Sequence, residues 1–271
     1  NVRKILSEYL ACGIDPEKAA IYVQSDVKEV LELYLYLNMN AYLGELQRVT
    51  SFKEKARKQP ENVNAGLLTY PTLMAADILI HRADKVPVGK DQEQNMEMAR
   101  KFARRFNTIY GVEFFPEPQS YSFGGDAIKV PGLDGSGKMG KSEGNAIYLI
   151  DDAATIRKKV MKAVTDSGPT QPNSEKPEAI ANLFTMLKIV SSADTYDYFN
   201  EKYNACEIRY GDLKKQLAED IVNFTSPIRE RILAYAADTE YMDKVAREGA
   251  EKARASADKT IREVRKIIGF N

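Results

Sequence analysis

The chain has 271 residues, and its 39 lysines and arginines balance 39 aspartates and glutamates, so the formal net charge is zero. This balance excludes a globally basic, histone-like nucleic-acid binder, but not a local basic patch. Apolar residues make up 44% and charged residues 29%, which is typical of a soluble globular protein, and no uncharged apolar run approaches the roughly 20 residues of a membrane span. The length suits two domains or one large α/β domain.

Predicted strands and helices alternate in the first half of the chain. Residues 19–24 (AAIYVQ) are apolar and rich in β-formers, which predicts a buried strand. A later helix is expected to begin at Asn62 or Asn64, and Pro71 to kink or divide it. Strand, helix and strand at this spacing predict a parallel sheet with crossover connections. The other predicted elements of this half are helices over residues 27–38, 41–50 and 91–110 and a strand over residues 86–89.

The second half of the chain begins with a loop and is otherwise helical. Residues 115–145 include seven glycines between Gly124 and Gly144, which predicts a mobile loop. A strand is predicted over residues 146–150. The last stretch, residues 252–271, holds six basic and two acidic residues, which is typical of a solvated helix face or of a basic binding surface. The predicted helices cover residues 152–163, 177–190, 193–203, 210–224, 228–236 and 242–267.

Histidine and cysteine are scarce. His81 is the only histidine, which excludes a multi-histidine metal site and makes any Ser-His-Asp or Cys-His catalyst depend on this one residue. His81 follows Asp77 by four positions, so we expect an ordinary helix-surface or capping histidine, and no metal-ligating residues in the chain. Cys12 and Cys206 are far apart and form neither a disulfide framework nor a zinc cluster, which favours a reducing compartment and predicts a cytoplasmic protein.

A glycine-rich segment, residues 135–142 (GSGKMGKS), matches the Walker A pattern G-x-x-x-x-G-K-[ST]. Residues 147–151 follow as a candidate Walker B strand, so a P-loop NTPase is one interpretation. A Walker A loop needs a preceding strand and a helix that opens at its Gly-Lys-Ser, but Glu143 and Gly144 are a poor helix start and leave no room for a crossover helix. We therefore expect a flexible loop whose lysines meet polyphosphate, although a solvated surface loop would have the same composition.

The same loop supports a second interpretation. Residues 138–142 (KMGKS) resemble the K-M-S-K-S loop of the class I aminoacyl-tRNA synthetases. Further segments, in order along nearly the whole chain, resemble the tryptophanyl-tRNA synthetases; each is weak alone, and their combination is specific. The sister tyrosyl family shares the architecture but differs in its counterpart of residues 86–92. The segments are residues 52–55 (FKEK), 59–67 (QPENVNAGL), 70–79 (YPTLMAADIL), 86–92 (VPVGKDQ), 162–167 (KAVTDS) and 210–215 (YGDLKK).

This resemblance implies both a fold and an activity. The implied fold is α/β, with a Rossmann-like, parallel-sheet catalytic domain over residues 1–150 and an α-helical, anticodon-binding domain over residues 151–271, whose last helix is free to pack back on the catalytic domain. The implied enzyme activates tryptophan with ATP and Mg²⁺, giving tryptophanyl-adenylate and pyrophosphate, and then esterifies the 3′ end of tRNA(Trp). The family acts as a homodimer, so the implied partners are L-tryptophan, ATP, tRNA(Trp) and a second copy of the chain, with no membrane.

The resemblance also implies which residues bind tryptophan. The indole-recognising aspartate of the family corresponds to Asp77, and Met74 lies three residues before it on the same helix face, where a thioether can contact the ring. Gln92 matches the residue that holds the ammonium group. From the helix pattern alone, Asp77 would equally suit a polar position on an amphipathic helix. The implied tryptophan-binding residues are Tyr70, Met74, Asp77, Val86, Val88 and Gln92.

The implied ATP site centres on the loop lysines. Lys138 and Lys141 match the lysines that hold the ATP phosphates and stabilise charge as pyrophosphate leaves, and Ser142 matches the closing serine of the loop. Gly140 departs from the usual serine, which removes one hydroxyl and loosens the backbone. The implied catalytic residues are Lys138, Lys141 and Ser142, and the implied ATP-binding residues are Gly89, Asp91, Gln92, Ile128, Lys138, Met139, Lys141 and Ser142.

One element of the family has no counterpart here. Class I synthetases carry an H-I-G-H-like element between the first strand and its helix, and none is found in the chain. His81 cannot replace it, because this histidine belongs to a later predicted helix. Since residues 2–10 match the end of the region after that element, we expect the sequence to lack an N-terminal segment, and with it part of the ATP site and of the tryptophan pocket.

Three rival functions make different predictions. A P-loop NTPase would hydrolyse ATP without tryptophan and lose this activity in Lys141→Ala. An RNA-binding module that uses residues 53–58 and 252–271 would bind RNA in a salt-sensitive way, without amino-acid-dependent pyrophosphate exchange. A tyrosyl-type class I synthetase would exchange pyrophosphate with tyrosine in place of tryptophan.

Overall fold

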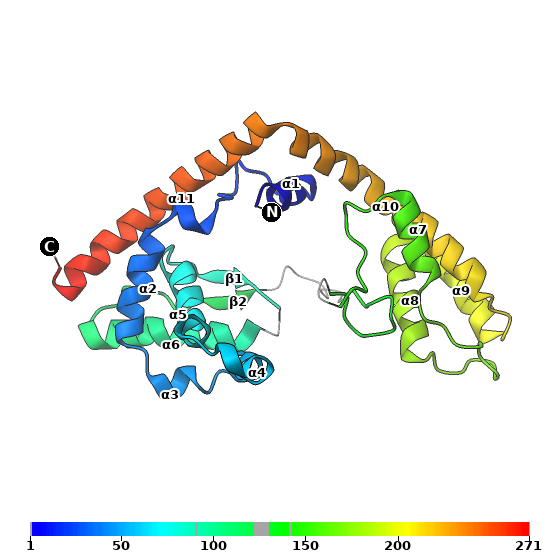
Figure 1. The fold of residues 1–271 in the computed structure, drawn as a ribbon, viewed down its shortest axis with the longest axis horizontal. Coiled ribbons are helices and arrows are strands. Elements are labelled where there is room, and N and C mark those ends of the chain that lie inside the picture. Colours follow the sequence, from blue (N-terminus) through cyan, green and yellow to red (C-terminus); the bar gives the residue numbers. More distant parts are fainter. Residues whose placement is uncertain (1, 90–91, 122–129, 141–142, 271) are drawn as a thin grey trace. The chain divides into compact units, whose positions relative to one another are not determined.

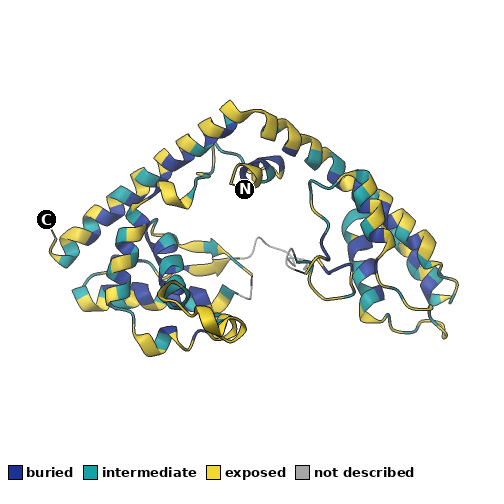
Figure 2. Cartoon of the chain, viewed as in Figure 1, coloured by how far each residue is buried: buried dark blue, intermediate teal, exposed yellow. Residues whose placement is uncertain are grey.

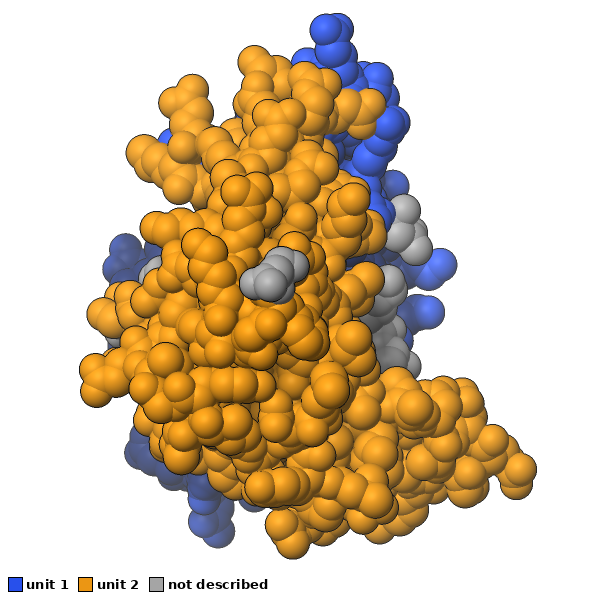
Figure 3. All heavy atoms as spheres, turned by 90° about the vertical axis from the view of Figure 1, so that its left-hand side faces the viewer, with its two compact units in different colours: residues 1–15, 128–242 blue, residues 16–127, 243–271 orange. Residues whose placement is uncertain are grey.

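The computed structural model describes residues 2–89, 92–121, 130–140 and 143–270 (Figure 1). The chain divides into two compact units, each made of two separate stretches of sequence (Figure 3). Unit 1 comprises Asn1–Asp15 and Ile128–Met242, and unit 2 comprises Pro16–Ala127 and Asp243–Asn271. These boundaries lie elsewhere than the division expected at residue 150, because the last helix packs into the core of unit 2.

Unit 2 contains a strand–helix–strand arrangement. Strands β1 (Lys85–Pro87) and β2 (Gln119–Tyr121) pair in parallel, with Lys85 opposite Gln119. Helix α6 (Glu93–Tyr110) connects them, as parallel pairing requires a crossover. The parallel sheet and the crossover helix predicted from the sequence are therefore confirmed, while β2 lies in a stretch for which the sequence predicts a loop.

Helix α5 (Ala65–Leu79) carries most of the candidate tryptophan-binding residues. It begins at one of the two predicted positions, because the Asn64 side chain accepts a hydrogen bond from the Leu67 amide at 2.9 Å and caps the first turn. The helix continues through Pro71, so the proline does not divide it. The other helices of this part of unit 2 are η1 (Gln24–Asp26), α2 (Glu29–Met39), α3 (Leu43–Leu46), α4 (Thr50–Lys58) and η2 (Pro60–Asn62).

The last helix, α11 (Thr239–Ile268), closes the core of unit 2. The residues that it contributes to this core recur at helical spacing and are Ala253, Ala257, Ile261 and Val264. Near its end, the Arg265 guanidinium donates to both carboxylate oxygens of Glu32 on α2, each at 2.6 Å. The helix is thus held to unit 2 by an apolar face and by a bidentate ion pair.

The strand predicted over residues 19–24 is not present. Residues 19–23 are irregular, and Gln24 begins the 3₁₀ helix η1. Gly249 of α11 lies against this segment so closely that a Cβ at position 249 would be 1.9 Å from the Ile21 carbonyl oxygen. The apolar run therefore packs on a helix instead of pairing in a sheet, and a short apolar run does not distinguish these two environments.

Unit 1 is helical, and its buried residues lie on the sides of the helices that face one another (Figure 2). Helix α10 (Tyr210–Ala237) continues through Pro227, so the two helices predicted over residues 210–224 and 228–236 are one. It packs on three of the other helices, α1, α7 and α8. The others are α1 (Val2–Ala11), α7 (Ala153–Met161), α8 (Glu178–Val190) and α9 (Ala193–Asn204), and the last three confirm predicted helices.

The strand predicted over residues 146–150 is also absent. These residues form a turn and irregular backbone, and their polar groups bond to side chains: the Tyr148 amide donates to Asp151 Oδ2 at 2.9 Å, and Lys159 Nζ donates to the Ala146 carbonyl at 2.9 Å. Backbone groups that bond to side chains do not need a strand partner. Across the ranges that the structure describes, no helix is long and apolar enough to cross a membrane.

Candidate active site

Three candidate tryptophan-binding residues share one face of α5. Tyr70, Met74 and Asp77 follow one another at intervals of four and three residues, and each is half-buried. The positions between them include Ala75 and Ala76, which are fully buried in the core of unit 2. The helix therefore rests on its apolar side and presents an aromatic ring, a thioether and a carboxylate in a row.

The Asp77 carboxylate is oriented by a side chain from the segment before α2. Gln24 Nε2 lies 2.8 Å from each of the two carboxylate oxygens. Burial raises the pKa of Asp77, while the hydrogen bond from Gln24 and the nearby His81 act in the opposite direction. The Asp77 carboxylate is thus held in one orientation. In that orientation it can accept a hydrogen bond from a single N–H donor of a ligand.

His81 bridges two segments of unit 2. The helix ends at Leu79, so His81 lies in the following turn. Its Nε2 is 2.9 Å from the Tyr22 hydroxyl, and its Nδ1 is 3.2 Å from Ser256 Oγ on α11. Burial lowers the pKa of His81, partly offset by Asp77. The imidazole thus does more than the surface or capping role expected from the sequence, because it ties the end of α5 to α11.

The strand β1 and the start of α6 supply the next candidates. Val86 and Val88 are half-buried and pack against the core of unit 2. The Gln92 amide donates to the Gly89 carbonyl at 3.0 Å, and Gln92 Oε1 accepts from Asn95 Nδ2 at 2.9 Å. These contacts set the turn between the strand and the helix, so Gln92 lies at the helix N-terminus.

Tyr70 is also held by α4. Its hydroxyl is hydrogen-bonded to Ser51 Oγ, and Lys55 Nζ lies 4.4 Å from the centre of its ring. The basic stretch over residues 53–58 is therefore a helix, and one of its lysines is engaged by an aromatic ring.

The glycine-rich loop belongs to unit 1 and has no regular secondary structure in the residues that are described, 130–140 and 143–150. The Lys138 side chain is exposed, and its backbone carbonyl accepts from Ser136 Oγ at 3.2 Å and from Asn145 Nδ2 at 3.1 Å. The Met139 amide donates to the Val130 carbonyl at 3.0 Å. The backbone around Lys138 is therefore held by polar contacts while its ammonium group is accessible.

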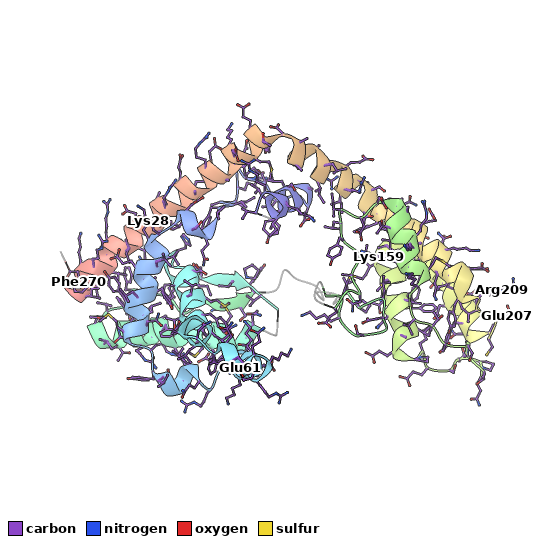
Figure 4. All side chains as sticks on the ribbon, viewed as in Figure 1. Lys28, Glu61, Lys159, Glu207, Arg209 and Phe270 are labelled. Carbon is purple, nitrogen blue, oxygen red and sulfur yellow. The ribbon has the colours of Figure 1, made fainter. Side chains whose placement is uncertain are left out.

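Lys159, which projects from α7 (Figure 4), anchors the far end of this loop. Its Nζ donates to the Ala146 carbonyl at 2.9 Å and to Asp151 Oδ2 at 2.5 Å, and it lies 4.6 Å from the centre of the Tyr148 ring. This lysine is half-buried and fully engaged, in contrast to the exposed Lys138.

The predicted site residues thus lie in two groups, one in each unit. The candidate tryptophan-binding residues all lie in unit 2, and Lys138 and Met139 lie in unit 1. Two residues with clear roles in the geometry are not among the predicted ones: Gln24, which ends the apolar run that predicts a strand, and Asn145, which no sequence signal distinguishes within its loop. Four predicted residues, Asp91, Ile128, Lys141 and Ser142, lie outside the described residues.

The surroundings of the loop do not fit a P-loop NTPase. Residues 143–152 contain neither the helix that follows a Walker A loop nor the predicted Walker B strand, and α7 begins only at Ala153. Among the described residues, no group of three or more His, Cys, Asp or Glu side chains is placed to hold a metal ion.

A parallel strand–helix–strand unit joined in one chain to a helical unit is compatible with the α/β enzyme class that the sequence resembles. The model of the tRNA synthetases class I (W and Y) family matches residues 1–226. The chain therefore belongs to this family of aminoacyl-tRNA synthetases. The match overturns the P-loop interpretation of residues 135–142 and also the RNA-binding module without catalytic activity.

Individual relatives point to one amino acid. The chain is 79% identical over 270 residues to the tryptophan–tRNA ligase of Porphyromonas gingivalis, covering 100% of this chain and 83% of that protein. It is 41% identical to the enzyme of the same name from Listeria monocytogenes, covering 100% and 81%. Among solved structures, the tryptophanyl-tRNA synthetase of Campylobacter jejuni complexed with ADP and tryptophan superposes with a TM-score of 0.86 at 33% identity, covering 99% of this chain and 82% of that one.

Proposed function

We propose that this protein is a tryptophan–tRNA ligase. The observation that carries this assignment is the 79% identity to a tryptophan–tRNA ligase over the whole chain. In the first step, a tryptophan carboxylate oxygen attacks the α-phosphorus of ATP, the bond to the bridging oxygen breaks, and pyrophosphate leaves. In the second step, a hydroxyl at the 3′ end of tRNA(Trp) attacks the carbonyl carbon of the adenylate and releases AMP.

Unit 2 selects the amino acid in this proposal. The Asp77 carboxylate accepts the indole N–H, Met74 contacts the ring, and Val86 and Val88 form an apolar wall beside it. Gln92, at the start of α6, holds the ammonium group. Support comes from the shared helix face of Tyr70, Met74 and Asp77, and from the half-buried position of each side chain.

The glycine-rich loop handles the phosphates. The exposed ammonium group of Lys138 on a braced backbone fits a polyphosphate, and Lys141 and Ser142 are assigned to the same role from the motif. Mg²⁺ bound to the ATP phosphates shares their negative charge. Gly89, Asp91, Gln92, Ile128 and Met139 complete the proposed ATP site. The lysines act mainly as pyrophosphate departs, because negative charge on the leaving group develops at that point.

The helices over residues 151–271, of which residues 151–242 belong to unit 1 and residues 243–271 to unit 2, bind the tRNA anticodon in this proposal. The domain assignment follows from the family, and we assign the anticodon-binding surface to residues 151–271, as expected from the sequence. Because the reaction consumes tRNA and ATP, we assign it to the cytoplasm.

We also propose that the enzyme is a homodimer that associates through α2. Three apolar residues spaced by four on this helix are open to solvent: Leu31, Leu35 and Met39 are 61%, 57% and 75% exposed. Leu43, the first residue of α3, is also exposed, at 58%. A contiguous apolar stripe of this kind is typical of an interface between subunits.

The dimer is tested by light scattering on size-exclusion fractions. Leu35→Asp should convert the protein to a monomer, since it places a charge at the centre of the stripe. Leu233→Asp, at an apolar position of α10 that is 45% exposed, is the matched control and should leave the dimer intact. An unchanged mass for Leu35→Asp, or an equal loss in both variants, would contradict the assignment.

The ligase function is tested on the full-length protein, by ATP–pyrophosphate exchange with each of the twenty amino acids. Tryptophan alone should support rapid exchange, and the same protein should then charge tRNA(Trp). Exchange with tyrosine in place of tryptophan would assign a tyrosyl enzyme, and ATP hydrolysis without any amino acid requirement would assign an NTPase.

A further inference from the structure

Asn145 is the centre of a polar cluster inside the glycine-rich loop. Its side chain is buried, with the residue 6% exposed. The amide nitrogen lies 2.9 Å from Asp134 Oδ1, 3.0 Å from Ser136 Oγ and 3.1 Å from the Lys138 carbonyl oxygen, and these three acceptors share its two hydrogens. The amide oxygen accepts from the Gly140 amide at 2.9 Å. One side chain thus holds the backbone on both sides of Met139, and we call Asp134, Ser136 and Asn145 the loop brace.

The loop brace lies so close to Gly132 that no side chain fits at this position. A Cβ at Gly132 would lie 2.3 Å from Asn145 Nδ2, 2.4 Å from Asp134 Oδ1 and 2.6 Å from Ser136 Oγ. The Gly132 amide donates to the Ser136 carbonyl at 2.9 Å. Only glycine leaves room for this arrangement, which indicates that the backbone is shaped around the three polar side chains.

The loop brace is supported by one helix of unit 1 and by a contact within the loop itself. Asn182 of α8 donates to the carbonyls of Gly135 and Ser136, each at 3.0 Å. On the other side, the Ile147 amide donates to the Met139 sulfur at 3.4 Å. The position of the loop backbone is therefore set by α8 together with polar contacts within the loop.

An asparagine is chemically suited to this position. The site needs donors toward Asp134 and the Lys138 carbonyl and an acceptor toward the Gly140 amide, and a carboxamide supplies both. An aspartate at position 145 would lose the donors and face the Asp134 carboxylate, whose pKa is lowered by hydrogen bonds from Ser136 and Asn145. A leucine of similar shape would leave the Lys138 carbonyl and the Gly140 amide without these partners.

We propose that Asn145 is a positioning residue for adenylate formation, because it sets the backbone from which Lys138 extends toward the departing pyrophosphate. The proposal rests on the proposed function of Lys138. Asn145 does not itself touch the reacting atoms: it acts through the geometry of residues 138–140. A displacement of about 1 Å in a charge-stabilising group can lower a rate by roughly 100-fold.

The experiment compares Asn145→Ala and Asn145→Asp with the unchanged protein in ATP–pyrophosphate exchange at saturating tryptophan. The maximal rate should fall by roughly 10- to 100-fold in Asn145→Ala, and at least as far in Asn145→Asp. The dissociation constant of tryptophan, measured by equilibrium dialysis with labelled amino acid, should stay within about twofold, because tryptophan is bound by residues of unit 2. A loss of folded protein would instead lower the exchange rate and the number of tryptophan-binding sites by the same fraction, so the number of sites is measured in the same dialysis experiment.

Three further variants make the test specific. Asn200→Ala removes the acceptor of Lys176 Nζ, 2.8 Å away in the same unit, and should leave the exchange rate unchanged. Ser136→Ala removes one exposed member of the loop brace and should lower the rate by a smaller factor, even if Asn145→Ala does not fold. In a Lys138→Ala background, Asn145→Ala should add little, because both changes act on the same step.

The outcomes separate the two proposals. Normal exchange in Asn145→Ala together with slow exchange in Lys138→Ala would overturn the inference and leave the function of the loop intact. Full additivity of the two changes would also overturn it, because Asn145 would then act independently of Lys138. Normal exchange in Lys138→Ala would instead refute the proposed role of the lysine on which the inference rests.

Discussion

The candidate tryptophan-binding face of α5 and the glycine-rich loop position their side chains in opposite ways. On α5, Tyr70, Met74 and Asp77 are aligned by the period of the helix, and the helix is held by buried apolar neighbours. In the loop, the backbone around Lys138 follows no regular period and is held by the side chain of Asn145. The first region depends on packing and the second on a few hydrogen bonds.

This difference matches the work proposed for each region. Selection of a rigid aromatic substrate requires groups that do not move, and a packed helix face supplies them. Stabilisation of a leaving group requires a cation whose side chain can adjust to reach the phosphate. The backbone that carries this side chain has to be held in a defined position. A single buried amide meets both needs, since it orders the loop backbone and leaves the lysine side chain free. Mutations should therefore affect binding in the first region and rate in the second.

The largest effect is expected from Lys138→Ala. Removal of one charge-stabilising donor typically costs about 100- to 1,000-fold in rate, so the maximal rate of pyrophosphate exchange should fall by this order. The dissociation constant of tryptophan should remain within a few-fold, because the lysine belongs to unit 1 and meets charge that develops only as pyrophosphate leaves. Exchange kinetics and equilibrium dialysis measure the two quantities separately.

Lys188→Ala is the matched control for this variant. Lys188 is exposed on α8 in the same unit, and its removal should change neither quantity. If Lys138→Ala lost tryptophan binding and kept its rate at saturation, the contrast between the two regions would be reversed and the assignment of the loop would fail.

Asp77→Ala should have the next largest effect, and it should appear in binding. Loss of a hydrogen bond to a charged group costs roughly 1.5–3 kcal/mol, which weakens tryptophan binding by about 10- to 150-fold. Phenylalanine, which has no N–H to offer, should lose much less, so discrimination between the two amino acids narrows. If Asp77→Ala binds tryptophan and rejects phenylalanine as the unchanged protein does, Asp77 is only a surface carboxylate.

A third variant, Gly249→Ala, leaves Asp77 unchanged and displaces the segment whose Gln24 side chain holds it. In Gly249→Ala, the added Cβ would lie 1.9 Å from the Ile21 oxygen and push the segment that carries Gln24 away from α11. Such overpacking should reduce the free energy of unfolding by about 1–3 kcal/mol, and tryptophan affinity should fall with little change in exchange rate at saturation. Thermal unfolding and dialysis measure the two effects.

Gly211→Ala provides the comparison in the other unit. Gly211 lies in the first turn of α10, and a Cβ added there would meet nothing within 4 Å, so alanine should stabilise the helix by about 0.4–1 kcal/mol. Equal destabilisation by both substitutions would show that the close approach at Gly249 has no energetic consequence.

Much of this arrangement could be predicted from the sequence, and the reasons differ between the regions. Helix α5 is predictable because its cap and its apolar period are local properties of the sequence. A parallel sheet with a crossover helix is predictable from the alternation of strands and helices, but the pairing of β1 with β2 is not, because β2 lies in a stretch that predicts a loop. The strand predicted before Gln24 is wrong, because an apolar run reports burial without saying whether a sheet or the distant Gly249 covers it.

The loop brace could not be predicted in the same way. Asn145 contacts Asp134, Ser136 and Lys138 over seven to eleven positions in a stretch without regular structure, and no periodic pattern encodes such a network. The two lysines of the loop could be predicted, because the sequence motif itself specifies lysine at these positions. The residue that orders the backbone of Lys138 is specified only by contacts in the folded loop, so polar side chains inside irregular loops escape pattern-based prediction.

The smallest effect, a shift in pH dependence, should arise from Gln24→Ala. Tryptophan binding needs the ionised form of Asp77, so affinity should fall as the pH drops through the pKa of this carboxyl group. Burial raises that pKa, and the donor of Gln24 restrains the rise by stabilising the charged form. Removal of the donor raises the pKa of Asp77 further. The acid limb of the binding profile should therefore move to higher pH, while affinity well above the limb changes by only a few-fold.

Two other titratable groups face Asp77 and have to be separated from it. Burial lowers the pKa of His81 and raises that of Tyr22, so both are neutral in the upper part of the titration. A shift of the acid limb in Gln24→Ala reports on the carboxylate, because Gln24 donates to Asp77. The dissociation constant of tryptophan is measured from about pH 4 to about pH 8. Gln94→Ala, which removes an exposed acceptor of the Thr50 amide, should leave the profile unchanged. A limb that stays in place in Gln24→Ala, or moves to lower pH, would mean that Gln24 only fills space beside Asp77.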